Sequence, residues 1–417
     1  MIGAGIFLMP AALAAYGGIS IFGWLFSAVG ALLLATMFSR LSKLVRDKNG
    51  GPYVYTKEGL GDFAGFLVAW GYWISTWVAN AAITIAFVSA LTVFFPILGT
   101  NALYAVVLGL TTIWFLTWIN SKGIRESGKM QVVTTLLKLI PLVLVIIGGI
   151  FFFNADNFIP FNPSIETNLS AIAITATMTL YAFLGVESAT IPAGNVEHPE
   201  KTIPKATMLG TIITTLIYFL STVVIMGMIP ADVLSKSPAP FADAMDIIAG
   251  GWGRGLVAAG AAIAAFGALN GWILIQGQIA MATAKDDLFP RIFKKENKNG
   301  VPALGIIIGS VLTSIVMLMN YSDGLVEQFK FIILLSTLCV LVPYLFTSAA
   351  YVLILAERKQ PNLKCLPEIV LASLAFAFSL WAIYGAGEEA VYFGFLLLLA
   401  GIPFYVWMKY RNKSKTH

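Results

Sequence analysis

Two charged side chains lie inside apolar stretches of this sequence: Glu187 in TLYAFLGVESATIPAG and Lys138 in QVVTTLLKLIPLVLV. A charged group inside hydrocarbon costs roughly 3 kcal/mol on insertion scales, so each is expected to face a cavity or a partner at a functional site. Two structural alternatives stay open. The long stem of Lys138 could extend back toward the membrane surface, and Glu187 could be a hydrogen-bonded structural carboxyl.

Glycines interrupt two of the apolar stretches. Gly3, Ala4 and Gly5 open the first one, MIGAGIFLMPAALAAYGG, and Gly185 lies two residues before Glu187. Glycine disfavours helix, and an interrupted membrane segment is tolerated where its free backbone groups line a cavity or are buried in protein. A small-residue packing face is the alternative for the first stretch. No basic residue precedes it, as a secretory signal would require.

Composition places most of the chain in lipid. The 417 residues are 58% hydrophobic and 11% charged, whereas soluble domains carry about 25% charged residues. Two cysteines and two histidines predict neither a disulfide framework nor a metal site, and no cofactor is expected. A membrane enzyme would need a nucleophile–base pair or a metal cluster, so this class is disfavoured.

The distribution of basic residues predicts a topology. We predict twelve spanning segments, the first incomplete: 1–16, 19–42, 63–93, 102–120, 132–153, 170–193, 206–229, 253–281, 301–320, 331–356, 368–386 and 391–408. Of the 26 Lys and Arg residues, 22 lie in loops on one side and three on the other. The positive-inside rule therefore predicts a multi-pass protein of the cell inner (plasma) membrane with a cytoplasmic C-terminus, and the basic charge does not indicate nucleic acid.

The two interrupted segments are the first and the sixth. Interruptions at corresponding positions of two halves are typical of secondary transporters built from inverted repeats, and a channel or receptor would not need them. We therefore predict a first repeat over residues 1–153 and a second over 154–356. Residues 357–417 would add two helices and a basic cytoplasmic tail.

Ordered motifs along the chain carry a family resemblance. They are IGAGIFLMPA (2–11), GGPYVYTKEGLG (50–61), FLGVESA (183–189), IPKATMLG (203–210), MGMIP (226–230), SPAPFADA (237–244), GWILIQGQ (271–278), DDLFPRIF (286–293) and VPYLF (342–346). The chain resembles the amino acid–polyamine–organocation superfamily, and is most similar to its basic amino acid/polyamine antiporters of the arginine/agmatine type.

This resemblance implies an all-α integral membrane fold like that of the leucine transporter. The fold has about twelve transmembrane helices, a 5+5 inverted repeat, and broken helices 1 and 6. The family begins with a cytoplasmic half-helix before the first break, and this chain lacks that half. We therefore expect Met1 to be an internal methionine of a longer protein, through a misassigned start or a truncation.

The resemblance places substrate at the two breaks. Free N–H groups at Ala4, Gly5 and Ile6 would bind the α-carboxylate of an amino acid at the positive end of a half-helix. Unwound carbonyls would accept hydrogen bonds from the α-ammonium around Tyr181, Ala182 and Leu184.

Two aromatic side chains and one amide complete the implied binding site. Tyr181 stands where the arginine/agmatine antiporter has a tryptophan that covers the substrate, which weakens arginine specificity. Trp272 would pack on the substrate side chain with a cation–π contact, and packing alone is the alternative. Asn80 matches a polar substrate contact, and ordinary interhelical hydrogen bonding is its alternative.

Three further residues match an inner gate: Tyr72, Glu187 and Tyr344. A buried carboxyl beside two phenols can change protonation and thereby bias opening. Lys138 stands where sodium-coupled transporters of this fold hold an ion, so the resemblance implies transport without sodium.

The predicted function is a permease, an amino acid/amine antiporter for cationic amino acids or polyamines that works by alternating access. Proton-coupled, sodium-independent symport of neutral amino acids is the alternative. The implied partners are the small-molecule substrate and the lipid bilayer, and a homodimer is compatible with the resemblance. No nucleic-acid partner is expected.

Overall fold

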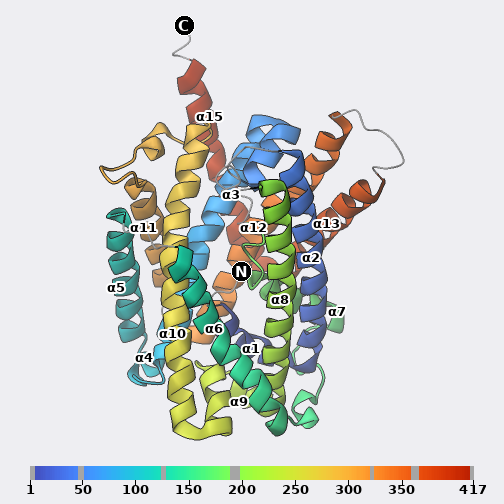
Figure 1. Cartoon of the computed structure of the whole chain (residues 1–417), viewed down its shortest axis with the longest axis vertical. Helices are drawn as coiled ribbons and strands as arrows, with labels where there is room; N and C mark the ends of the chain where they lie inside the picture. The colour runs from blue at the N-terminus through green and yellow to red at the C-terminus, as the bar shows by residue number, and fades with distance from the viewer. Residues whose placement is uncertain are drawn as a thin grey trace.

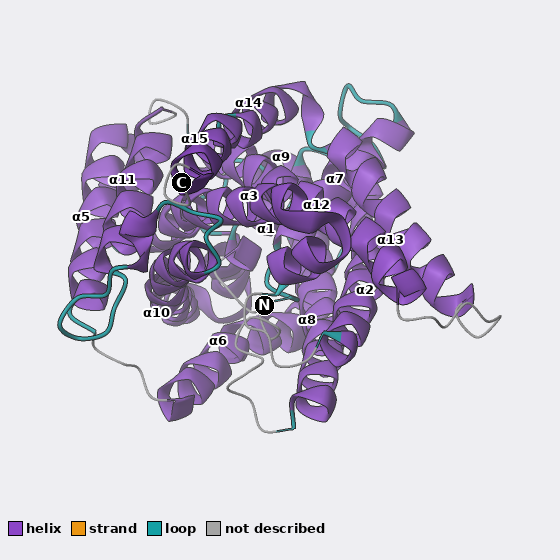
Figure 2. Cartoon of the chain, turned by 90° about the horizontal axis from the view of Figure 1, so that it is seen from above, coloured by secondary structure: helices purple, strands orange, loops and turns teal. Residues whose placement is uncertain are grey.

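The computed structural model describes residues 5–45, 51–123, 128–187, 198–319, 324–357 and 366–413. The side chains of residues 128–138, 199–200 and 412–413 lie outside the described part of the chain. Throughout the described ranges the regular structure is helical, and no strand occurs in them (Figure 2). The predicted all-α class is therefore confirmed.

The α-helices follow one another as α1 (Met9–Ala14), α2 (Ser20–Leu44), α3 (Pro52–Leu91), α4 (Ile97–Thr100), α5 (Ala102–Ser121), α6 (Gly128–Gly149), α7 (Asn168–Tyr181), α8 (Pro199–Met228), α9 (Ala231–Leu234), α10 (Pro240–Lys285), α11 (Ala303–Met319), α12 (Leu325–Glu357), α13 (Leu366–Gly385), α14 (Gly387–Leu399) and α15 (Gly401–Lys413). Short 3-10 turns lie at η1 (Gly5–Phe7), η2 (Gly17–Ile19), η3 (Ile150–Phe152), η4 (Ala155–Phe158) and η7 (Arg291–Lys294).

Eight helical stretches among the described residues are long and apolar enough to cross a membrane. They are Gly17–Leu44, Pro52–Leu91, Ala102–Ser121, Lys201–Met228, Pro240–Lys285, Leu325–Glu357, Leu366–Gly385 and Gly387–Arg411. Leu139–Phe152 and Ala303–Met319 are shorter apolar helices. The outer helices expose large apolar side chains, such as Val29 of α2 and Leu103 of α5, which suit contact with lipid tails. The multi-pass membrane class is confirmed, and the count of twelve spans stays a prediction.

Two of the long helices, α3 and α10, begin much earlier than the apolar pattern predicts. α3 starts at Pro52 instead of residue 63, and α10 starts at Pro240 instead of residue 253. Each contains one glycine with positive φ, Gly61 at 83° and Gly250 at 68°, where the helix kinks. The helix before each kink is shorter than a membrane span, so a search for apolar stretches of spanning length misses it.

The bundle surrounds α3, which packs against both α10 and α12. Seen from above, α1, α3 and α12 lie near the centre, with α5 and α11 on one side and α2, α7 and α13 on the other (Figure 2). α4 and α9 lie at one end of the bundle and α15 at the opposite end (Figure 1). Short irregular segments near the centre are thus enclosed by long helices.

The two segments predicted to be broken are irregular where the structure describes them. At the first, η1 is followed by a turn at Leu8 before α1 begins. At the sixth, α7 ends at Tyr181 and residues 182–187 form successive turns, with Gly185 at φ 95°. Residues 1–4 and 188–197 lie outside the described residues, so complete breaks in both segments stay predictions.

Candidate functional site

A fully enclosed carboxyl joins three parts of the bundle. Glu187, in the turns after α7, is 1% exposed. The Tyr72 hydroxyl of α3 donates to its Oε1 and the Tyr344 hydroxyl of α12 donates to its Oε2, both at 2.5 Å. Each carboxyl oxygen thus has a hydrogen-bond donor in place of water. The predicted trio of gate residues is therefore in contact, although its role in gating stays a prediction.

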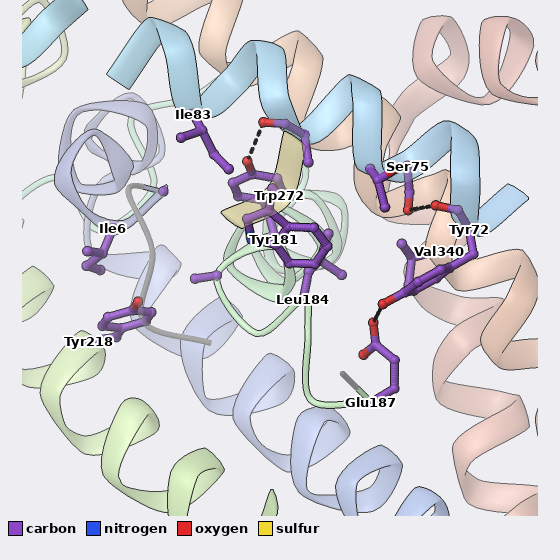
Figure 3. Close-up of a pocket in the computed structure, with 14 residues that line it drawn as sticks. Ile6, Tyr72, Ser75, Ile83, Tyr181, Leu184, Glu187, Tyr218, Trp272 and Val340 are labelled. Carbon is purple, nitrogen blue, oxygen red and sulfur yellow. Dashed lines mark hydrogen bonds between the residues drawn. The ribbon is translucent and has the colours of Figure 1, made fainter. Parts of the chain in front are cut away.

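Glu187 also lines a cavity at the centre of the bundle, with about 40 Å³ of free volume. Figure 3 shows it at one end of this cavity, with the Tyr72 hydroxyl pointing at the carboxyl. The volume suffices for a few water molecules and is too small for an amino acid. Several predicted site residues line its wall: Gly5, Ile6, Tyr181, Ala182, Leu184 and Trp272. The structure thus brings the N-terminal segment, the end of α7 and α10 to one place.

Tyr181 crosses the cavity from the end of α7 (Figure 3). Its hydroxyl donates to the Ala79 carbonyl of α3 at 3.3 Å, and its ring meets Phe329 edge to face with centroids 6.1 Å apart. A Cβ placed on Gly5 would lie 2.7 Å from the ring atom Cε1 of Tyr181. Glycine at this position therefore lets the phenol ring lie directly against the N-terminal backbone.

The cavity also has lining residues that sequence reasoning missed. They are Ser75, Thr76, Ala79 and Ile83 of α3, Tyr218 of α8 and Val340 of α12. The α3 residues could have been found, because they follow Tyr72 at helical spacing on one face. Tyr218 lies next to Phe219 in an apolar helix, a pattern that gives no signal of its own.

Asn80 is not among the residues that line the cavity. Its side chain is fully buried, and Nδ2 donates to Oε1 of Gln276 on α10 at 2.8 Å. Gln276 in turn donates to the Ile306 carbonyl at 3.0 Å and to Ser310 Oγ at 3.1 Å, both on α11. A substrate contact at Asn80 stays a prediction. Gln276 was missed, although a glutamine within an apolar span is itself a signal.

Two predicted residues cannot be placed in this site. Ala4 lies outside the described residues, and so does the side chain of Lys138, whose backbone belongs to α6. Their roles in binding and in replacing sodium stay predictions. Within the described ranges, no group of three or more His, Cys, Asp or Glu side chains could hold a metal ion.

Known proteins match this sequence over nearly the whole chain. A family model described as amino acid permease matches residues 1–407. The chain is 33% identical to an arginine/ornithine antiporter of Pseudomonas aeruginosa, over 96% of this chain and 86% of that protein. It is 32% identical to a cadaverine/lysine antiporter of Escherichia coli K12, over 99% of this chain and 93% of that protein. An arginine/agmatine antiporter of Chlamydia pneumoniae is 32% identical, over 97% of this chain and 87% of that protein.

Proposed function

The chain belongs to the amino acid permease family, and from this premise we propose that it exchanges a cationic amino acid for an amine or a second cationic amino acid. The three antiporters to which it is similar are named for arginine/ornithine, cadaverine/lysine and arginine/agmatine. They share a substrate with a positive side chain, which is the chemistry we assign to this chain. It is a transporter and not an enzyme.

The observation that carries the proposal is the cavity where two irregular segments meet. Gly5 and Ile6 of the first segment and Ala182 and Leu184 of the second all line it. An α-amino acid needs N–H donors for its carboxylate and carbonyl acceptors for its ammonium, and irregular backbone offers both without charged side chains. Tyr181 and Trp272 supply aromatic surface for the rest of the substrate.

The small volume of the cavity supports the interpretation that in this conformation the cavity is closed to substrate. Tyr181 closes one approach by its contact with Gly5 and its hydrogen bond to Ala79. Glu187 closes the other by holding Tyr72 and Tyr344 together. Alternating access would release one set of contacts at a time, so that substrate reaches the cavity from one side only.

The position of the kinked helices supports the inverted repeat. α3 is the third span of the proposed first repeat (1–153) and α10 is the third span of the second (154–356). Each begins with a short helix that kinks at a glycine with positive φ. We place the two helical spans of residues 357–417 outside the repeats, and the basic C-terminal tail that follows them on the cytoplasmic side of the inner membrane.

Exchange in proteoliposomes tests this function. Vesicles loaded with unlabelled arginine, lysine, ornithine, agmatine or cadaverine should take up labelled arginine or lysine faster than empty vesicles. Saturable uptake that requires an internal counter-substrate supports the antiporter. Uptake of neutral amino acids driven by a proton gradient into empty vesicles would instead support the symporter, and linear uptake would indicate a channel.

A further inference from the structure

A pair of buried amides flanks the cavity between α3 and α10. Asn80 and Gln276 are both 0% exposed, and one hydrogen bond of 2.8 Å joins them. Asn80 Oδ1 has no hydrogen-bond partner among the described residues. An unpaired acceptor in such a place is costly, because burial removes the water that would otherwise satisfy it.

A chain of hydrogen bonds fixes which atom of each amide faces which neighbour. The Ile306 carbonyl can only accept, so the atom of Gln276 that faces it at 3.0 Å must be the donor Nε2. Gln276 Oε1 therefore faces Asn80, which must present its own donor, Nδ2, at 2.8 Å. As a result, the oxygen of Asn80 is left as the free atom of the pair.

The packing around Gln276 holds this arrangement in place. A second Nε2 contact reaches Ser310 Oγ at 3.1 Å, and Ser310 Oγ also accepts from Thr117 at 2.6 Å. Gly309 lies directly beneath the amide, because a Cβ added there would be 2.5 Å from Cδ of Gln276. The side chain is therefore anchored to α11 and has no room to turn over.

Both amides lie one helical turn from the wall of the cavity. Thr76 precedes Asn80 by four residues on α3, and Trp272 precedes Gln276 by four residues on α10, which places each pair on the same side of its helix. Thr76 and Trp272 both line the cavity. A substrate side chain that extends past Trp272 would thus approach Asn80.

We propose that Gln276 is a positioning residue for substrate specificity. By holding the Asn80 amide through Nδ2, it presents Oδ1 as an acceptor for the N–H groups of a cationic side chain. It also disfavours side chains that carry only acceptors, because the two oxygens would face each other without a hydrogen between them. The inference rests on the proposed exchange of cationic amino acids and names a residue that sets its selectivity.

The test compares lysine with norleucine, which has the same α-amino acid group and side-chain length but no terminal ammonium. The measured quantity is the ratio of their inhibition constants against uptake of labelled lysine. Gln276→Met keeps the length of the side chain and removes its hydrogen bonds, and it should reduce the wild-type preference for lysine by about tenfold. Thr283→Val on the same helix is the matched control, since the Thr283 hydroxyl has the Ile279 carbonyl, one turn before it, as its single partner among the described residues.

A double-mutant cycle separates positioning from general damage. If Gln276 acts through Asn80, then Gln276→Met should change the ratio no further in an Asn80→Ala background. Independent effects on the ratio, or an unchanged ratio in the single variant, would overturn the inference. Should Gln276→Met not fold, Gly309→Ala displaces the same amide sterically and is expected to lower the ratio likewise.

The same assay distinguishes failure of the inference from failure of the proposed function. A wild-type protein that takes up neither lysine nor arginine refutes the function. A wild-type protein that prefers lysine to norleucine, together with variants that keep this preference, refutes the role of Gln276 alone.

Discussion

The ring of Tyr181 lies against the backbone of Gly5, so close that a Cβ on Gly5 would be 2.7 Å from Cε1 of the ring. The same tyrosine bonds to the Ala79 carbonyl of α3. One side chain thus joins the end of α7 to the N-terminal segment and to α3. Any substrate that enters the cavity must displace this ring or bind beneath it, which makes the Gly5–Tyr181 contact sensitive to added volume.

Gly5→Val should abolish substrate binding while expression and folding survive. The added methyl groups would meet the Tyr181 ring, and they would also block close approach of a carboxylate to the local N–H groups. Binding is measured as the rise in melting temperature on addition of arginine or lysine. Gly255→Ala is the matched control, because its Cβ would find only Phe94 within reach, at 3.9 Å. An unchanged ligand shift in Gly5→Val would contradict backbone recognition at this position.

Trp272→Leu should weaken the binding of cationic substrates more than the binding of neutral ones. A cation–π contact at a desolvated site contributes about 2 kcal/mol, so lysine should lose roughly 30-fold in affinity and norleucine much less. Inhibition of labelled uptake by each compound measures the difference. Trp114→Leu, on α5 and 41% exposed, controls for loss of a tryptophan away from the cavity. Equal losses for lysine and norleucine would leave Trp272 with packing alone.

Much of the architecture could be predicted from the sequence, because hydropathy and the absence of polar partners in lipid restrict each span to helix. The helices before Gly61 and Gly250 could not, since each is too short to be found as a membrane span. Exact starts of α3 and α10 were missed for this reason.

In the candidate site, too, the sequence identifies some residues, whereas most of their contacts emerge only in the structure. Glu187 could be singled out alone, as an acid in an apolar segment. Its contacts with Tyr72 and Tyr344 span 115 and 157 residues, so no local pattern predicts them, and only the family resemblance suggested the trio. The bond between Asn80 and Gln276 spans 196 residues and emerged from the structure.

Lys138 should make transport independent of sodium. A tethered ammonium at an ion position supplies the charge that a bound cation would otherwise provide, so replacing sodium chloride by choline chloride should leave the exchange rate unchanged. Lys138→Ala should lower turnover more than the melting temperature, and Lys138→Arg, which keeps the charge, should be less impaired. Stimulation of the wild-type rate by sodium would refute this role.

Glu187→Gln should flatten the pH dependence of transport while substrate still binds. The carboxyl is 1% exposed and its two oxygens accept from Tyr72 and Tyr344. A neutral carboxyl in place of a carboxylate would remove a charge from the cavity and one acceptor from the phenols, which would change the balance between closed and open gates. Glutamine keeps the shape and one acceptor oxygen but cannot lose a proton, so it holds the neutral form at every pH.

Exchange rates of wild type and Glu187→Gln, measured from acidic to neutral pH, test this effect. Tyr72→Phe and Tyr344→Phe serve as matched variants, because each removes one donor to Glu187 and leaves the acid in place. They should keep a pH-dependent rate, because the carboxyl to which we assign the pH response is still present. Parallel profiles for wild type and Glu187→Gln would mean that the carboxyl has a structural role and that pH acts on another group.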